Sequence, residues 1–82
     1  RDYYTGIVYE REAKARLQRR YPGADHDVYD LLHDAMDWFQ RADDLHPVGN
    51  EDARLRWNTC ARIVMERNLT PRPKDNTEQH LE

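Results

Sequence analysis

The sequence contains one cysteine and no serine, and only three of its 82 residues are glycine. A single cysteine excludes an internal disulfide framework and fits a reducing compartment. Because serine is absent, a serine nucleophile is excluded. Gly6, Gly23 and Gly49 lie too far apart to form a glycine-rich loop that cradles phosphate. With so little catalytic material, we expect no enzyme and no bound cofactor.

Long apolar runs are also missing. No stretch approaches the roughly 20 apolar residues that cross a bilayer. No secretory leader is recognisable either, so we expect a cytoplasmic protein that does not bind membranes. Lysine is scarce, since arginine outnumbers it eleven to two. That bias indicates a bacterial source with a GC-rich genome.

The short length bounds the core. Burying a large side chain stabilises a fold by roughly 1.5–3 kcal/mol, while ordering each residue costs about 1.5 kcal/mol. These contributions nearly cancel in a chain of 82 residues, so its stability is expected to be marginal or helped by a partner surface. Such a core leaves little room for a deep catalytic pocket.

The charges are unevenly distributed within a net charge of −3. Residues 1–20 carry six basic and three acidic groups, whereas residues 21–47 carry seven aspartates and one arginine. This pattern predicts neighbouring helices of complementary charge. An alternative is a small nucleic-acid-binding or regulatory protein that uses the basic face of the first helix, although an acidic domain repels phosphate at long range. The basic residues concerned are Arg11, Lys14, Arg16, Arg19 and Arg20.

Apolar periodicity predicts three helices, over residues 3–20, 26–46 and 51–69. Pro22-Gly23 ends the first, and Pro47-Val48-Gly49 separates the other two. Asp25 and Asn50 are the expected caps of the second and third helices. The apolar faces comprise Tyr9, Ala13 and Leu17; then Val28, Leu32, Ala35, Phe39, Ala42 and Leu45; and then Ala53, Trp57, Cys60, Ala61 and Val64.

Short turns between three helices predict antiparallel neighbours. We therefore expect an all-α fold, a three-helix antiparallel bundle forming a single domain over residues 1–69. Residues 70–82 contain Pro71 and Pro73 and have no apolar period, so they are expected to be a flexible, disordered tail.

Residues 32–64 resemble a partial, degenerate tetratricopeptide repeat. The second helix of that repeat carries the pattern A-x3-F-x2-A followed by leucine and proline, matched here by Ala35, Phe39, Ala42, Leu45 and Pro47. Trp57, Cys60, Ala61 and Val64 have the spacing of the next W-x2-L-G-x2-Y helix, with weaker residue types and one extra helical turn between the two halves. The resemblance implies a helical hairpin plus one helix, and a surface that binds proteins.

One polar constellation has metal-ligand residue types. His26, Asp30, His33 and Asp37 recur at spacings of four, three and four, which puts them on one face of the second helix. Ligands of a working site usually come from several elements, so the preferred interpretation is a solvated polar face and no metal site. Weak binding of a divalent cation to this face is left open.

The aromatic residues give the best functional indication. Three short helices cannot bury all eight of them, and Tyr, Trp and Arg are enriched where proteins bind one another. We therefore predict a non-enzymatic protein–protein interaction module whose partner is another protein or a second copy. The predicted contact residues are Tyr3, Tyr4, Tyr29 and Trp38, with Arg54 and Arg56 at the rim.

Overall fold

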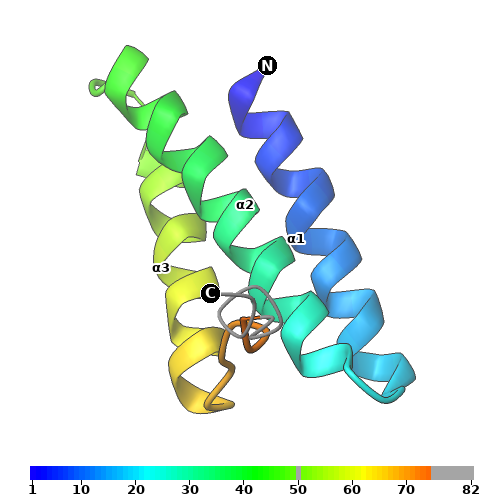
Figure 1. The fold of residues 1–82 in the computed structure, drawn as a ribbon. Helices are drawn as coiled ribbons and strands as arrows, with labels where there is room; N and C mark the ends of the chain where they lie inside the picture. Colours follow the sequence, from blue (N-terminus) through cyan, green and yellow to red (C-terminus); the bar gives the residue numbers. More distant parts are fainter. Residues whose placement is uncertain (50, 75–82) are drawn as a thin grey trace, which may run out of the picture.

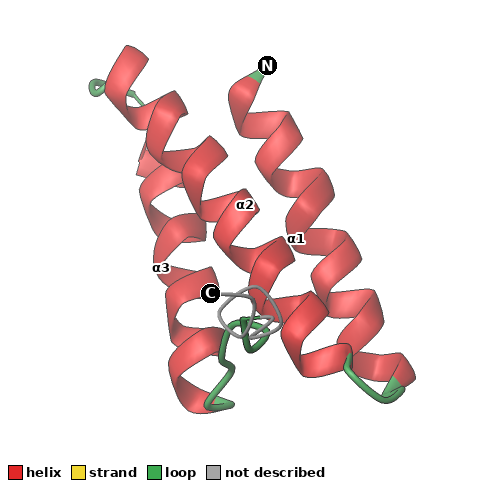
Figure 2. Cartoon of the chain, viewed as in Figure 1, coloured by secondary structure: helices red, strands yellow, loops and turns green. Residues whose placement is uncertain are grey.

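The computed structural model describes residues 1–49 and 51–74. Over these residues the chain forms α1 (Asp2–Arg19), α2 (Ala24–Leu45) and α3 (Glu51–Glu66), and no strand (Figure 2). α2 lies between α1 and α3 and runs antiparallel to both (Figure 1). The predicted all-α, three-helix antiparallel architecture is confirmed. None of the described helices has the length and apolar character needed to span a membrane.

The core forms where the apolar face of α2 meets α1 and α3. Phe39 is the largest fully buried side chain. As predicted, the face of α2 opposite the core is exposed and charged. Leu45 was expected on the buried face but is 66% exposed, because it is the last residue of α2. The buried apolar residues of the three helices are Ala13, Ala24, Val28, Leu32, Ala35, Met36, Phe39, Ala42, Ala53 and Cys60.

Gly6 allows α1 to approach α2 closely. The ring of Phe39 lies directly against it, and a methyl group placed on Gly6 would come within 2.6 Å of the nearest ring carbon. Any larger residue would therefore have to displace a fully buried aromatic ring. The centre of the α1–α2 contact thus depends on an aromatic side chain packed against bare backbone.

The start of α2 differs from the prediction. The cap position is occupied by Gly23, with φ 82°, and no side chain there bonds to the helix end. The prediction of Asp25 as the cap is wrong, because the turn after Pro22 needs a residue in the left-handed region, which glycine adopts without strain. Asp25 lies in the first turn instead, where its charge favours the helix N-terminus. Asn50, the predicted cap of α3, lies outside the described residues.

The end of α3 comes earlier than expected. The helix stops at Glu66, and Asn68 adopts a left-handed conformation with φ 54°. The Leu69 amide then donates to the Val64 carbonyl at 3.0 Å, which turns Leu69 back onto the core, where it is 6% exposed. This is the usual way a left-handed residue ends a helix.

Residues 70–74 have no regular secondary structure, and they lie against α2. The Thr70 carbonyl oxygen is 3.0 Å from His26 Nδ1, and Arg72 forms an ion pair with Asp27. The rest of the predicted tail, residues 75–82, lies outside the described residues.

Candidate protein-interaction surface

Tyr3 and Arg56, two of the six predicted contact residues, bind each other within the molecule. Arg56 Nε donates to the Tyr3 hydroxyl at 2.9 Å, and Arg56 Nη1 lies 3.2 Å from Glu10 Oε1. The Tyr3 hydroxyl and the Glu10 carboxylate raise the pKa of the Arg56 guanidinium, so it is a fixed cation. The Tyr3 ring also packs against Phe39, with ring centroids 5.8 Å apart. These two residues join α1 to α3.

Glu10 is the acceptor at the centre of this arrangement. Its side chain is 2% exposed, and Lys14 Nζ lies 2.8 Å from its second carboxylate oxygen. A buried carboxylate needs paired charges and hydrogen bonds to be tolerated, and here α1 and α3 each supply a cation. Glu10 and Lys14 are four residues apart, which is the spacing of an ordinary ion pair on one helix. The burial depends on Arg56, which is 46 residues away in the sequence.

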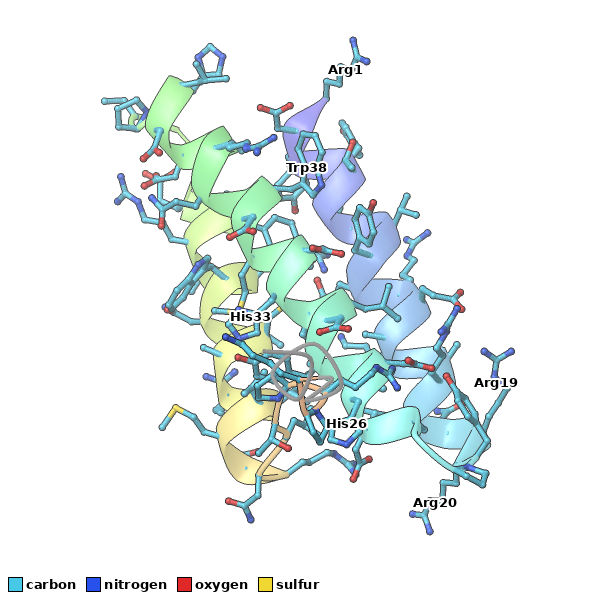
Figure 3. The ribbon with its side chains drawn as sticks, viewed as in Figure 1. Arg1, Arg19, Arg20, His26, His33 and Trp38 are labelled. Atoms are coloured by element: carbon cyan, nitrogen blue, oxygen red, sulfur yellow. The ribbon has the colours of Figure 1, made fainter. Side chains whose placement is uncertain are left out.

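Tyr29 and Trp38 lie on different sides of α2. Nine residues separate them, which at 3.6 residues per turn is two and a half turns. Tyr29 packs on His33 with ring centroids 4.2 Å apart, while Arg41 lies 4.7 Å from the Trp38 ring. Figure 3 shows His33 toward α3 and Trp38 toward α1. The predicted aromatic residues therefore do not form one continuous surface.

Tyr4 lies on the outer face of α1. It is 69% exposed, and Val8, one turn further along, is 65% exposed. Arg11 follows on the same face and has no ion-pair partner among the described residues. Of the predicted aromatic contacts, Tyr4 is therefore the one most available to a partner.

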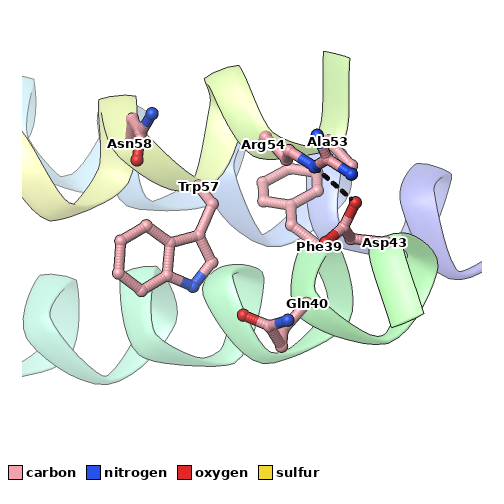
Figure 4. A pocket seen from close by; sticks show the side chains of 7 residues that line it. All are labelled: Phe39, Gln40, Asp43, Ala53, Arg54, Trp57 and Asn58. Atoms are coloured by element: carbon pink, nitrogen blue, oxygen red, sulfur yellow. Dashed lines mark hydrogen bonds and ion pairs between the residues drawn. The ribbon is translucent and has the colours of Figure 1, made fainter. Parts of the chain in front are cut away.

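An open pocket lies between α2 and α3 (Figure 4). We call it the α2–α3 pocket; its volume is about 250 Å³. Its apolar lining consists of Phe39, Ala53 and Trp57, of which only Trp57 is partly exposed. Its rim is polar and consists of Gln40, Asp43, Arg54 and Asn58. A small apolar hollow with polar groups at its edge is the usual form of a binding site.

Arg54, a predicted rim residue, closes one end of the α2–α3 pocket. Its Nε lies 2.7 Å from Asp43 Oδ1, and an Nη2 hydrogen bond of 2.8 Å reaches the Pro47 carbonyl. This side chain therefore ties α3 to the end of α2 and to the turn between them. Asn58, further along α3, is exposed and has no hydrogen-bond partner among the described residues.

Sequence reasoning missed the α2–α3 pocket because Phe39 and Trp57 both have the register of core residues. Phe39 is fully buried, but Trp57 is only half-buried. Ala53, one turn before Trp57, also lines the pocket and is fully buried. A small residue beside two aromatic ones on facing helices was the available signal.

The polar constellation on α2 does not converge. His26 is turned toward Thr70, and His33 is stacked on Tyr29. In the described part of the chain no group of three or more His, Cys, Asp or Glu side chains is placed to hold a metal ion. Cys60 is fully buried, and burial raises the pKa of its thiol to about 12, which leaves it protonated and unreactive.

The basic residues of α1 are largely neutralised within the fold. Lys14 pairs with Glu10, and Arg16 pairs with Glu12 at 2.8 Å and with Asp27 at 3.4 Å. Hydrogen bonding to Arg16 lowers the pKa of Glu12 and keeps it ionised. The predicted complementarity between α1 and α2 is therefore realised in the Arg16–Asp27 pair.

No known protein family, curated protein or solved structure matches this chain.

Proposed function

We propose that this chain is a non-enzymatic helical module that binds another protein chain at the α2–α3 pocket. The observation that carries the proposal is an open hollow between two facing helices, in which the half-buried Trp57 ring is surrounded by hydrogen-bonding side chains. An interface anchor is typically one apolar side chain seated in such a hollow. Gln40 Nε2 donates to Asp44 Oδ1 at 3.0 Å, which leaves the Gln40 amide oxygen and the Asn58 amide to pair with the backbone of a bound segment.

The chemistry of the α2–α3 pocket supports binding over catalysis. Its charged groups, Asp43 and Arg54, are held in an ion pair with each other. The thiol of Cys60 is buried and protonated, so it is not a nucleophile.

The resemblance to a tetratricopeptide repeat is a second line of support and stays a prediction. Ala35, Phe39 and Ala42 of that pattern are buried in α2. Any amphipathic helix of this register would bury the same positions, so their burial does not identify the family. If the kinship holds, the family implies a protein-binding helical surface.

Nucleic-acid binding through α1 is the weaker proposal. Of the five basic residues named for this face, three have acidic partners within the fold: Lys14, Arg16 and Arg19. Phosphate would have to compete with these pairs. Nucleic acid bound in this way would be released steeply as the salt concentration rises.

A capture experiment tests the proposed function. Wild-type protein is immobilised beside Gln40→Arg/Asn58→Arg, which places two large cations at the pocket mouth without touching the core. Gln18→Arg is the matched control, since it makes the same kind of change at an exposed position of α1. Each is exposed to lysate at low and at high salt. Because packing resists salt, we expect a protein partner that wild type and the Gln18 variant retain at high salt.

The double variant should lose that partner. Retention by the double variant would contradict the pocket as the binding site, and nucleic acid recovered only at low salt would favour the basic face of α1. Circular dichroism of all three proteins establishes that they are equally folded.

A further inference from the structure

We infer that the α2–α3 pocket accepts the outer face of α1 from a second copy of this chain. The inference rests on the proposed function and names its partner. It follows from two exposed surfaces of the same molecule that complement each other in shape and charge. One presents apolar side chains among arginines, and the other presents an apolar hollow beside a row of aspartates.

The presenting surface is the outer face of α1. Tyr4 and Val8 are 69% and 65% exposed and lie one helical turn apart. Ala15 continues the same face, and Arg11 lies between them with no ion-pair partner in the described part of the chain. An amphipathic helix that offers apolar residues at such spacings is a common ligand for a groove between two helices. Within the described residues, nothing covers the exposed side chains of Tyr4 and Val8.

The accepting surface is the α2–α3 pocket together with the exposed row of α2. Asp30, Asp34 and Asp37 recur at four and three residues, so they lie on one stripe. All three are exposed and lack an ion-pair partner within the described residues. Gln40, at the rim of the pocket, follows Asp37 by three residues and is its neighbour on the helix. Asp37 therefore lies beside the mouth of the pocket, and Asp34 and Asp30 continue the row away from it along α2.

The two surfaces match when α1 of one copy lies along α2 and α3 of another. Val8 or Tyr4 then enters the α2–α3 pocket, and Arg11 faces the aspartate row. Within one copy, an arginine already pairs with an aspartate of α2, since Arg72 binds Asp27. The sequence after Lys74 is an unsuitable occupant, because residues 75–82 include Asp75, Glu78 and Glu82 and no arginine or lysine.

Such a contact joins two different surfaces of the chain. If two copies each insert α1 into the other's pocket, the contact is made twice and a two-fold dimer forms. If two copies share only one contact, each keeps one unused surface of each kind, and association continues beyond two copies or closes into a ring.

Sedimentation velocity over a range of concentrations tests the inference. Arg11→Glu reverses the charge of the presenting face, and Asp34→Arg/Asp37→Arg reverses that of the accepting row. Arg67→Glu is the charge-matched control, at an exposed position near the end of α3. We expect wild type and the Arg67 variant to form species larger than one copy as concentration rises. Each of the other variants alone should associate at least ten-fold more weakly.

An equimolar mixture of the two charge-reversed proteins gives the deciding result. In the mixture, the reversed α1 face of one protein meets the reversed α2 row of the other, and the two unchanged surfaces meet as well. Both contacts pair opposite charges, so species larger than one copy should return. Wild type that stays a single copy at every concentration would overturn the inference, and so would a mixture that stays dissociated. Thermal melts of each variant identify any that fail to fold. The capture experiment is separate: a foreign partner lost from the pocket variant would keep the proposed function even if self-association failed.

Discussion

Gly6 is the residue at which the smallest change should have the clearest effect. A glycine inside a helix normally costs about 1 kcal/mol relative to alanine, so replacing it usually stabilises the protein. Here the added methyl would lie 2.6 Å from a ring carbon of Phe39. We predict that Gly6→Ala lowers the free energy of unfolding by about 1–3 kcal/mol, the usual range for overpacking a core. Urea unfolding measures the change.

Two further variants separate packing from helix propensity. Gln18→Ala is an exposed change on the same helix and should be close to neutral. Gly6→Ala combined with Phe39→Leu should cost less than the sum of the two single changes, because the smaller side chain makes room for the methyl. A Gly6→Ala protein more stable than wild type would show that the ring is free to move.

Asp27 ties three segments together at the scale of the elements. It accepts a 2.8 Å hydrogen bond from the Tyr21 hydroxyl in the α1–α2 turn, and it pairs with Arg16 of α1 and with Arg72 after α3. Chiefly through the Tyr21 bond, and also through the two cations, these contacts lower the pKa of Asp27. The stabilisation is therefore present above the unfolded-state pKa, about 4, and is lost as the pH falls through the lower folded-state value.

Asp27→Asn should consequently lose less stability than wild type as the pH falls. We expect the variant to be less stable than wild type at pH 7, and the difference to shrink as the pH falls below about 4. Asp30→Asn, an exposed carboxylate on the same helix, is the control and should leave the curve nearly unchanged. Thermal melts between pH 2 and 7 measure how the stability of each protein depends on pH. If wild type and Asp27→Asn lost stability equally as the pH falls, the contacts of the ionised Asp27 would not stabilise the fold.

Glu10 joins α1 to α3. Removing it leaves Arg56 and Lys14 without their shared carboxylate inside a contact between two helices. We predict that Glu10→Ala destabilises by about 1–3 kcal/mol, the cost of an unsatisfied charged partner, since both cations are partly exposed. Glu12→Ala, which removes a half-exposed acceptor two residues further along α1, should cost less. The prediction fails if chemical denaturation ranks the two variants the other way.

At this scale the sequence predicted the helices better than their ends. Periodicity identified the three helices and the buried face of α2, because burial repeats with the helical turn. The start of α2 at Gly23 depended on the conformation of one turn, and the burial of Leu69 on a left-handed residue after α3. The burial of Glu10 needed a cation from a helix 46 residues away. Contacts between distant segments leave no local pattern.

The candidate site belongs to the whole molecule, and for that reason the sequence predicted it only in part. Tyr4 is exposed and Arg54 lines the pocket, while the prediction that either contacts a partner stays a prediction. Tyr3 and Arg56 had the right composition for an interface, but they bind each other inside. The α2–α3 pocket is lined from two helices, and the sequence indicated it only through a small residue and two aromatic ones at core positions.

Site-specific photocrosslinking tests directly whether the α2–α3 pocket contacts another protein chain. A photoreactive amino acid replaces Asn58 at the pocket mouth, or Glu66 at an exposed position of α3 away from it. We expect light-dependent crosslinks from position 58, to a foreign protein or to a second copy, and few or none from position 66. No crosslink from position 58, or equal crosslinking from both positions, would contradict it.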